Sequence, residues 1–208
     1  MAPKVTEEHL EARREQILGA AIACFAEKGF HKTSMKDICN KSQLSPGAVY
    51  HYFESKDDIV EAVCRMGEEQ NSALFEQTRK LGGSMREQVE FNLGGYLQML
   101  KDPLAETYLK ADIMFHAEVL TNERLRESGK RNYETILGHL QQVVESWQRE
   151  GHANKALDPR ATAQVLFATV NGIGFQKLID PDMDLDKYFQ SLSAIIMGDL
   201  TRLKDGAG

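Results

Sequence analysis

Apolar residues recur at spacings of three and four along almost the whole chain, which is the period of an α-helix. Near the C-terminus, for example, Phe189, Leu192 and Ile196 lie on one predicted helical face. No stretch of useful length alternates apolar with polar residues, as a half-buried β-strand would. We therefore predict an all-α chain of about nine helices and no sheet.

Three helix starts follow one another at intervals of about ten residues in the first third of the chain. Segments 34–37 and 55–58 both have the form Ser-x-x-Asp, typical of a capping box whose side chains bind free backbone N–H groups. Ser45-Pro46 is typical of an N-cap followed by the first helical residue. Gly29 stands where a glycine commonly ends a helix. These signals predict helices over 7–28, 34–41 and 45–51, and a long fourth helix that begins at 55.

The pair Gly82-Gly83 is the best candidate for a domain boundary. It predicts a first domain of residues 1–58 and a second domain of residues 82–208. The fourth helix is expected to connect the two as far as residue 81. Asp158-Pro159 indicates the start of a helix over 159–179, and the last helix is expected over 185–203. The helix over 159–179 is apolar on more than one face, which predicts burial on several sides.

The two short helices over 34–41 and 45–51 are joined by three residues, Ser-Gln-Leu, and such a pair predicts a helix-turn-helix. In that motif the start of the second helix enters the major groove of DNA. Pro46 loses no hydrogen bond at the first helical position. Gly47 has no Cβ to keep DNA away, and Ala48 is small enough to contact a thymine methyl group.

Beyond the start of this helix, three residues have side chains that can bind phosphate oxygens. Tyr50 and His51 can donate hydrogen bonds to phosphates, and Lys56 can contribute a positive charge. Val49, Tyr52 and Phe53 are expected to pack inward instead and to hold the short helix in place.

The formal charges of the chain are unevenly distributed. A net charge of −6 by itself argues against a nucleic-acid partner. Residues 28–56, however, contain five lysines and two acidic residues, which gives a local net charge of +3. Because salt screens charges beyond roughly 8–10 Å, a basic segment on an acidic body can still bind phosphates. A solvated helix face is the alternative explanation of such a segment.

The matches to a known family lie between residues 14 and 59. They are ILGAA (17–21), Phe25, Gly29-Phe30, Thr33-Ser34-Met35, Ile38 and LSPGAVYHYFESKDDI (44–59). This stretch resembles the DNA-binding domain of the TetR family of transcriptional regulators. Cys39 and Lys41 stand where the family favours small residues, and Ser42 stands where it often has glycine in the turn. The DNA-contacting residues that we predict are Thr33, Ser34, Lys41, Ser45, Pro46, Gly47, Ala48, Tyr50, His51 and Lys56.

The resemblance implies a homodimer that binds a palindromic operator in double-stranded DNA, most commonly as a repressor. It also implies dimerisation through the last two long helices, here 159–179 and 185–203. Small residues on these helices would allow close approach, and larger apolar ones would supply buried area. The expected interface residues are Ala161, Val165, Ala168, Gly172, Leu192, Ile195 and Ile196. The alternative is that these residues belong to the core of a single chain.

The resemblance further implies that the second domain binds a small effector, which we expect to be largely apolar because small-molecule pockets usually are. The candidate pocket residues are Phe91, Tyr96, Met99, Met114, Phe115, His116, Trp147, Asn171 and Phe175. An aromatic stripe at helical spacing can equally be plain core. The stretch NGIGFQKLIDPDMDLDKYF resembles the C-terminal part of regulators akin to the choline-responsive repressor BetI.

Other classes of function have less support in the sequence. There is no GxSxG, GxxxxGK[ST] or HExxH motif, and the six histidines lack metal-ligand spacing, so we expect neither an enzyme nor a metal or other cofactor. Three widely spaced cysteines, no signal-like stretch and no apolar run near 18 residues favour a cytoplasmic protein without a membrane span. A helical adaptor or ligand-binding protein without sequence-specific DNA binding remains the alternative, although it would not need Ser45-Pro46-Gly47 at a helix start.

Overall fold

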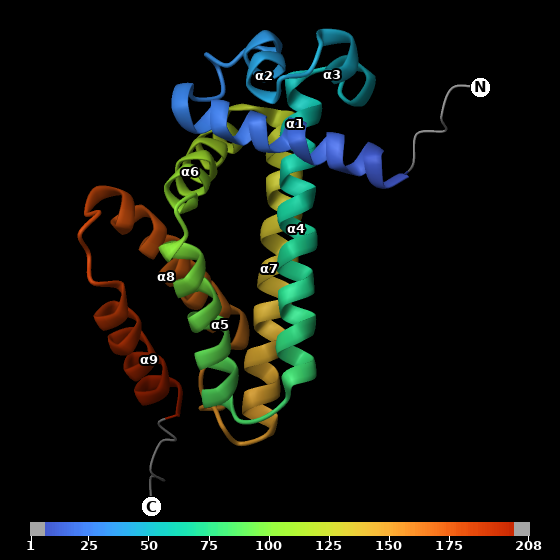
Figure 1. Cartoon of the computed structure of the whole chain (residues 1–208). Helices are drawn as coiled ribbons and strands as arrows, with labels where there is room; N and C mark the ends of the chain where they lie inside the picture. The colour runs from blue at the N-terminus through green and yellow to red at the C-terminus, as the bar shows by residue number, and fades with distance from the viewer. Residues whose placement is uncertain (1–6, 202–208) are drawn as a thin grey trace, which may run out of the picture. The chain divides into compact units, whose positions relative to one another are not determined.

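The structure is a computed structural model that describes residues 7–201 (Figure 1). All regular structure in this range is helical, which confirms the predicted all-α fold. The nine helices are α1 (Glu7–Lys28), α2 (Met35–Ser42), α3 (Pro46–Tyr52), α4 (Lys56–Leu81), α5 (Met85–Lys101), α6 (Ala105–Thr121), α7 (Glu123–Arg149), α8 (Pro159–Ile179) and α9 (Leu185–Thr201). The predicted starts of the first four helices agree within one residue. Residues 202 and 203, which we assigned to the last helix, lie outside the described range.

The predicted stop and start signals act as expected. Gly29 directly follows α1 and has a left-handed φ of 75°. Ser34 and Asp37 form a complete capping box at α2. At α4, the Ser55 N–H donates to Asp58 Oδ2 at 2.9 Å, and the Asp58 N–H donates to Ser55 Oγ at 3.2 Å. Each box satisfies backbone donors that would otherwise lack a partner, so the helices begin where the sequence indicates.

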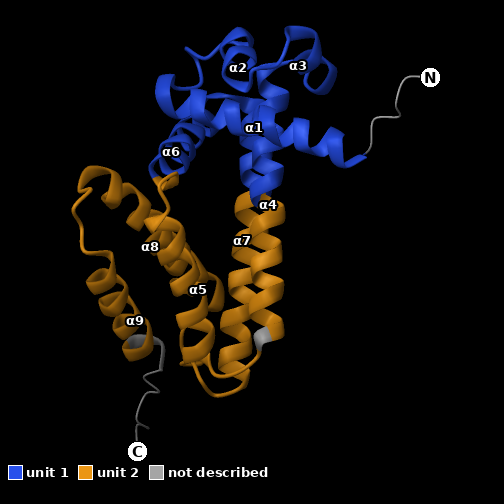
Figure 2. Ribbon diagram, in the orientation of Figure 1, with its two compact units in different colours: residues 1–67, 106–131 blue, residues 68–105, 132–208 orange. Residues whose placement is uncertain are grey.

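Contacts between residues divide the chain into two compact units that do not follow chain order (Figure 2). The first unit contains the chain up to Gly67 together with Glu106–Arg131. The second contains Glu68–Ala105 and the chain from Asn132 onward. This division differs from the boundary that Gly82-Gly83 suggested, because α6 and the start of α7 group with the N-terminal helices. Both glycines have left-handed φ angles, 61° and 79°, in the link between α4 and α5.

The core of the first unit receives side chains from each of the first four helices. Ile17, Ile38, Val49 and Ile59, one from each helix, are fully buried in it. Leu125, near the start of α7, is fully buried in the same cluster. Because helices as short as α2 and α3 are not stable alone, this shared core is what holds them in position.

The turn between α2 and α3 has its left-handed residue at Gln43, with a φ of 58°. This corrects the sequence comparison, which assigned the glycine-favouring position to Ser42. Ser42 is the last residue of α2, and its buried hydroxyl donates to the Cys39 carbonyl oxygen at 3.1 Å. The Gln43 N–H donates to the Asn40 carbonyl oxygen at 3.3 Å, which closes the helix end.

The second unit is tied together by polar contacts between its helices. Trp147 Nε1 of α7 donates to Gln88 Oε1 of α5 at 2.9 Å. The Tyr96 hydroxyl of α5 donates to the Val170 carbonyl oxygen of α8 at 3.2 Å. Met85, Val89, Val144, Trp147 and Ala153 form the buried cluster beside them. Among the described residues, none of the helices has an apolar stretch long enough to cross a lipid bilayer.

Candidate nucleic-acid interface

The first turn of α3 is presented to solvent. Ser45 caps it, because the Ala48 N–H donates to Ser45 Oγ at 3.2 Å. Pro46 and Gly47 are exposed, and a Cβ added at Gly47 would meet no atom within 4 Å. Val49, one position beyond Ala48, is fully buried. The start of α3 is therefore accessible to a ligand at close range, while Val49 anchors the helix to the core.

The aromatic residues of α3 and its C-cap, Phe53, differ in exposure. Tyr50 is 50% exposed, and His51 is exposed as well. Phe53 is buried, and Tyr52 packs against the core of the first unit. The predicted division between outward Tyr50 and His51 and inward Val49, Tyr52 and Phe53 is confirmed. The phosphate contacts of Tyr50 and His51 remain a prediction.

Lys56, at the start of α4, has intramolecular partners. Its ammonium group donates to the carbonyl oxygens of Phe30 at 2.6 Å and Thr33 at 3.0 Å. It also lies 4.1 Å from the centroid of the Phe30 ring, within cation–π range. Lys56 thereby holds the link between α1 and α2, and one of its three N–H donors is left for a phosphate. Sequence reasoning did not anticipate this clamp.

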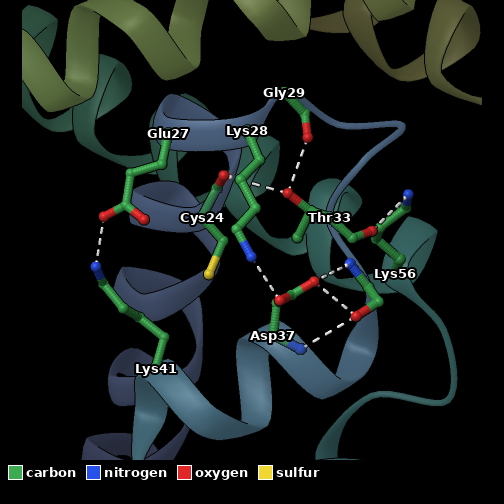
Figure 3. Close-up of polar contacts among 9 residues, drawn as sticks. Cys24, Glu27, Lys28, Gly29, Thr33, Asp37, Lys41 and Lys56 are labelled. Carbon is green, nitrogen blue, oxygen red and sulfur yellow. Dashed lines mark hydrogen bonds and ion pairs between the residues drawn. The ribbon is translucent and has the colours of Figure 1, made fainter.

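Thr33, labelled in Figure 3, and Ser34 both form hydrogen bonds in the link between α1 and α2. Thr33 is 2% exposed, and its hydroxyl lies 2.8 Å from the Gly29 carbonyl oxygen and 3.2 Å from that of Cys24. The enclosed hydroxyl cannot reach a phosphate in this structure, so we correct its assignment to a structural one. Ser34 is exposed, but its hydroxyl and N–H both bind Asp37 Oδ2, at 2.7 and 2.9 Å.

Two ion pairs connect the end of α1 to α2 (Figure 3). Lys28 Nζ lies 2.6 Å from Asp37 Oδ1, and Lys41 Nζ binds Glu27 Oε1. The hydrogen bond from Lys28, then those from Ser34, hold the pKa of Asp37 far below its ordinary value. The hydrogen bond to Glu27 raises the pKa of Lys41. Lys41, which we predicted to contact DNA, thus has a partner within the protein.

The first unit also contains charged contacts that sequence reasoning missed. Arg124 of α7 donates to Asp58 Oδ1 at 2.8 Å and to the Glu61 carboxylate at 2.7 and 3.1 Å. Hydrogen bonds from Arg124, and then from Ser55, lower the pKa of Asp58. His31 Nε2 lies 2.9 Å from Glu118 Oε1, whose side chain is buried. These partners are too far apart in sequence for any local pattern to reveal them.

Comparison with known proteins agrees with this geometry. The family model described as "Bacterial regulatory proteins, tetR family" matches residues 17–63, and "BetI-type transcriptional repressor, C-terminal" matches residues 97–198. The regulator YfiR of Bacillus subtilis is 30% identical over 175 residues, which cover 82% of both chains. This chain belongs to the TetR family. It is therefore a helix-turn-helix transcriptional regulator with a BetI-type C-terminal domain, and the family is not enzymatic.

Two further proteins extend the similarity over nearly the whole length of this TetR-family chain. The regulator UidR of Escherichia coli K12 is 28% identical over 189 residues, which cover 90% of this chain and 93% of UidR. The structure of GusR from Salmonella enterica has a TM-score of 0.76 and 26% sequence identity. It covers 96% of this chain and 100% of GusR. The similarity thus includes both units.

The structure divides the predicted effector residues of this regulator between the two units. Met114, Phe115 and His116 belong to the first unit, where Phe115 packs against the core and a hydrogen bond to Asp112 raises the pKa of His116. The other six belong to the second unit: Phe91, Tyr96, Met99, Trp147, Asn171 and Phe175.

The predicted effector residues of the second unit differ in how exposed their side chains are. Trp147 is a core residue, 5% exposed, and its indole N–H is bonded to Gln88, which corrects its assignment to the pocket. Asn171 is exposed, and its amide donates to the Phe167 carbonyl oxygen of its own helix. Phe91 and Met99 are about two-fifths exposed and lie eight residues apart on α5, and therefore on one face.

One face of α8 is apolar and exposed in the described part of the chain. Val165 is 64% exposed and Ile179 is 72% exposed, and Phe175 lies between them on the same face. Ala161, Ala168 and Gly172, predicted for the dimer interface, share this stripe by their spacing. The opposite face, with Ala163, Ile173 and Gly174, is buried. Phe175 thus shares a face with residues predicted for the interface, and its role in the pocket remains a prediction.

The residues predicted for the interface on α9 do not all point outward. Ile195 is 60% exposed. Leu192 is 7% exposed, and Ile196 packs against the core cluster of the second unit. Leu192 is thus buried within the single chain and Ile196 is partly buried, and their place in a dimer interface remains a prediction. Sequence spacing alone could not separate the two apolar faces of α9, because both recur with the helical period.

Proposed function

We propose that the protein is a cytoplasmic repressor that binds a palindromic operator as a dimer and releases it when a small, largely apolar effector binds. The observation that supports operator binding most directly is the open first turn of α3. Ser45, Pro46 and Gly47 leave its start accessible, while Val49 anchors it in the core. A helix held this way can enter a major groove without moving its own domain.

Binding to a selected sequence is the test of this function. The full-length chain would be used to select duplexes from a randomised library and, separately, to shift DNA that flanks its own gene. We expect recovery of an inverted repeat, bound far more tightly than a scrambled duplex of equal length. Equal binding to both duplexes, or no binding at low salt, would favour the alternative, a helical adaptor or ligand-binding protein without sequence-specific DNA binding.

The exposed stripe of α8 supports the dimer. An apolar helix face of this length, with Val165, Phe175 and Ile179 in water, is costly for a monomer and typical of an interface. Val165→Asp should therefore shift the protein to monomer in sedimentation experiments. Gln164→Asp, at the exposed neighbouring position, adds the same charge and should leave the dimer intact. A V165D dimer as stable as the wild type would exclude this face.

The effector is proposed to bind at the α5 face that carries Phe91 and Met99. Gly95 lies between them, and a Cβ there would meet no atom within 4 Å, so the face has room beside its backbone. Native mass spectrometry of the purified chain should reveal a bound apolar molecule. Met99→Gln should weaken release of DNA by that molecule and leave the affinity for operator unchanged. Equal release in wild type and variant would remove this face from the effector site.

A further inference from the structure

Three of the five lysines between residues 28 and 56 are engaged inside the first unit. Lys28 is paired with Asp37, Lys41 with Glu27, and Lys56 with two carbonyl oxygens. A lysine that already has a partner gains less from a phosphate, because the existing pair must be broken or shared. The count of lysines in this segment therefore overstates the charge that is available to DNA.

The remaining two lysines, Lys32 and Lys36, are exposed, and within residues 7–201 neither side chain has a hydrogen bond or an ion pair. Lys32 lies in the link just before the α2 capping box, and Lys36 lies in the first turn of α2. All three N–H donors of each ammonium group are thus free for an external acceptor.

The backbone that carries these two lysines is fixed on both sides. Thr33 is enclosed between the carbonyl oxygens of Gly29 and Cys24, and the Lys56 ammonium group binds the carbonyl oxygen of Thr33 itself. The segment is therefore ordered before any ligand arrives, and only the lysine side chains lose freedom on binding. Asp37, the nearby acidic residue in α2, is already paired with Lys28, so its charge cancels less of the positive charge of Lys32 and Lys36.

We propose that Lys32 and Lys36 are the principal lysine contacts to DNA phosphates on this surface, whereas Lys28 and Lys41 hold α1 against α2. The proposal rests on the operator binding proposed above. In a helix-turn-helix the first helix of the pair crosses the DNA backbone, and α2 has that place here. Such contacts give affinity and register and do not select the sequence.

The salt dependence of DNA binding tests the proposal. The probe is one duplex of fixed sequence that the wild-type chain has selected from a randomised library. Lys32→Ala and Lys36→Ala should each lower the slope of log affinity against log salt concentration by about 0.9, because one fewer phosphate is neutralised. Between 50 and 200 mM salt, the affinity advantage of wild type over each variant should fall about 3.5-fold.

Lys41→Ala is the matched control, since it removes the same formal charge from the same helix. Its slope should equal that of the wild type, and Lys36→Arg should restore the wild-type slope. Thermal unfolding of K32A and K36A should match the wild type, because neither lysine has a partner to lose. Equal slopes for K36A, K32A and wild type, or a lower slope for K41A alone, would overturn the proposal while operator binding stands. Absence of binding by the wild type would overturn the proposed function itself.

Discussion

Arg124, in the first turn of α7, donates a hydrogen bond to Asp58, the residue 66 positions earlier that closes the capping box of α4. The same guanidinium group binds Glu61 one turn further along α4. The start of the helix that follows the helix-turn-helix is thus held by an element from the middle of the chain. Lys56, whose ammonium group holds the α1–α2 link, is the first residue of the same helix.

Replacement of Arg124 should loosen the first unit. Arg124→Ala leaves two carboxylates without their partner, so we expect a lower Tm and weaker operator binding than in wild type. Arg131→Ala removes an exposed arginine of the same helix whose side chain makes no hydrogen bond or ion pair within residues 7–201, and it should change neither Tm nor DNA binding. An R124A protein with wild-type Tm would mean that the ion pairs contribute nothing measurable, as is common at exposed positions.

Acid should destabilise the first unit through Asp37 and Asp58. Both carboxyl groups have their pKa lowered in the folded state, Asp37 chiefly by Lys28 and Asp58 chiefly by Arg124. A carboxyl group whose pKa is lowered by folding stabilises the folded state at any pH above its ordinary pKa, which is near 3.9. This stabilisation is lost as the pH falls from there toward the folded-state pKa. Urea denaturation between pH 5 and pH 3 should show that the free energy of unfolding falls more steeply for wild type than for Asp37→Asn. Parallel curves would contradict the assignment.

Gly129 permits the close approach of α6 to α7. A Cβ at this position would lie 2.8 and 2.9 Å from the two Cγ atoms of Val119. Gly129→Ala should therefore destabilise the protein by roughly 1–3 kcal/mol, because Val119 must shift.

Gly138 offers the matched comparison on the same helix. A Cβ there would meet no atom within 4 Å. Gly138→Ala should stabilise the protein by about 0.5–1 kcal/mol, since alanine is the better helix former. Chemical denaturation of both variants, and of the double variant Gly129→Ala with Val119→Ala, would check this. Restored stability in the double variant is expected, and a stabilising G129A would refute the close contact.

Glycine at position 43 should stabilise the protein, whereas glycine at position 42 should destabilise it. Gln43 has a left-handed backbone that glycine adopts without strain, so Gln43→Gly should raise stability by about 1 kcal/mol. Ser42→Gly removes a buried hydrogen bond from a helical residue and should lower stability by roughly 1–2 kcal/mol. Opposite shifts of the two denaturation midpoints are the expected result. Shifts of the same sign would contradict the assignment of Gln43 as the left-handed residue of the turn.

Lys56 combines two roles that its alanine variant can separate. Loss of two hydrogen bonds from a charged donor should destabilise the first unit by roughly 1–3 kcal/mol. If Lys56 also contacts a phosphate with its third donor, the salt slope of DNA binding should fall by about 0.9 as well. A lower Tm with an unchanged slope would leave Lys56 with the clamp alone.

The sequence by itself determined the helices and the helix-turn-helix. Capping boxes, Ser45-Pro46 and Gly29 act through backbone groups within three or four residues, so their effect can be predicted locally. The exposed start of α3 and the inward direction of Val49 follow from the helical period within α3.

Only the tertiary structure decided which polar and apolar side chains remain free. Lys41 finds Glu27 across two helices, and Lys56 finds carbonyl oxygens 26 and 23 residues away. In the same way, Trp147 and Leu192 turned out to be core, whereas Phe175 lies on an exposed face. A residue type sets what a side chain can bind or bury against. Which partner it meets depends on how helices distant in sequence pack together, and no local pattern records that.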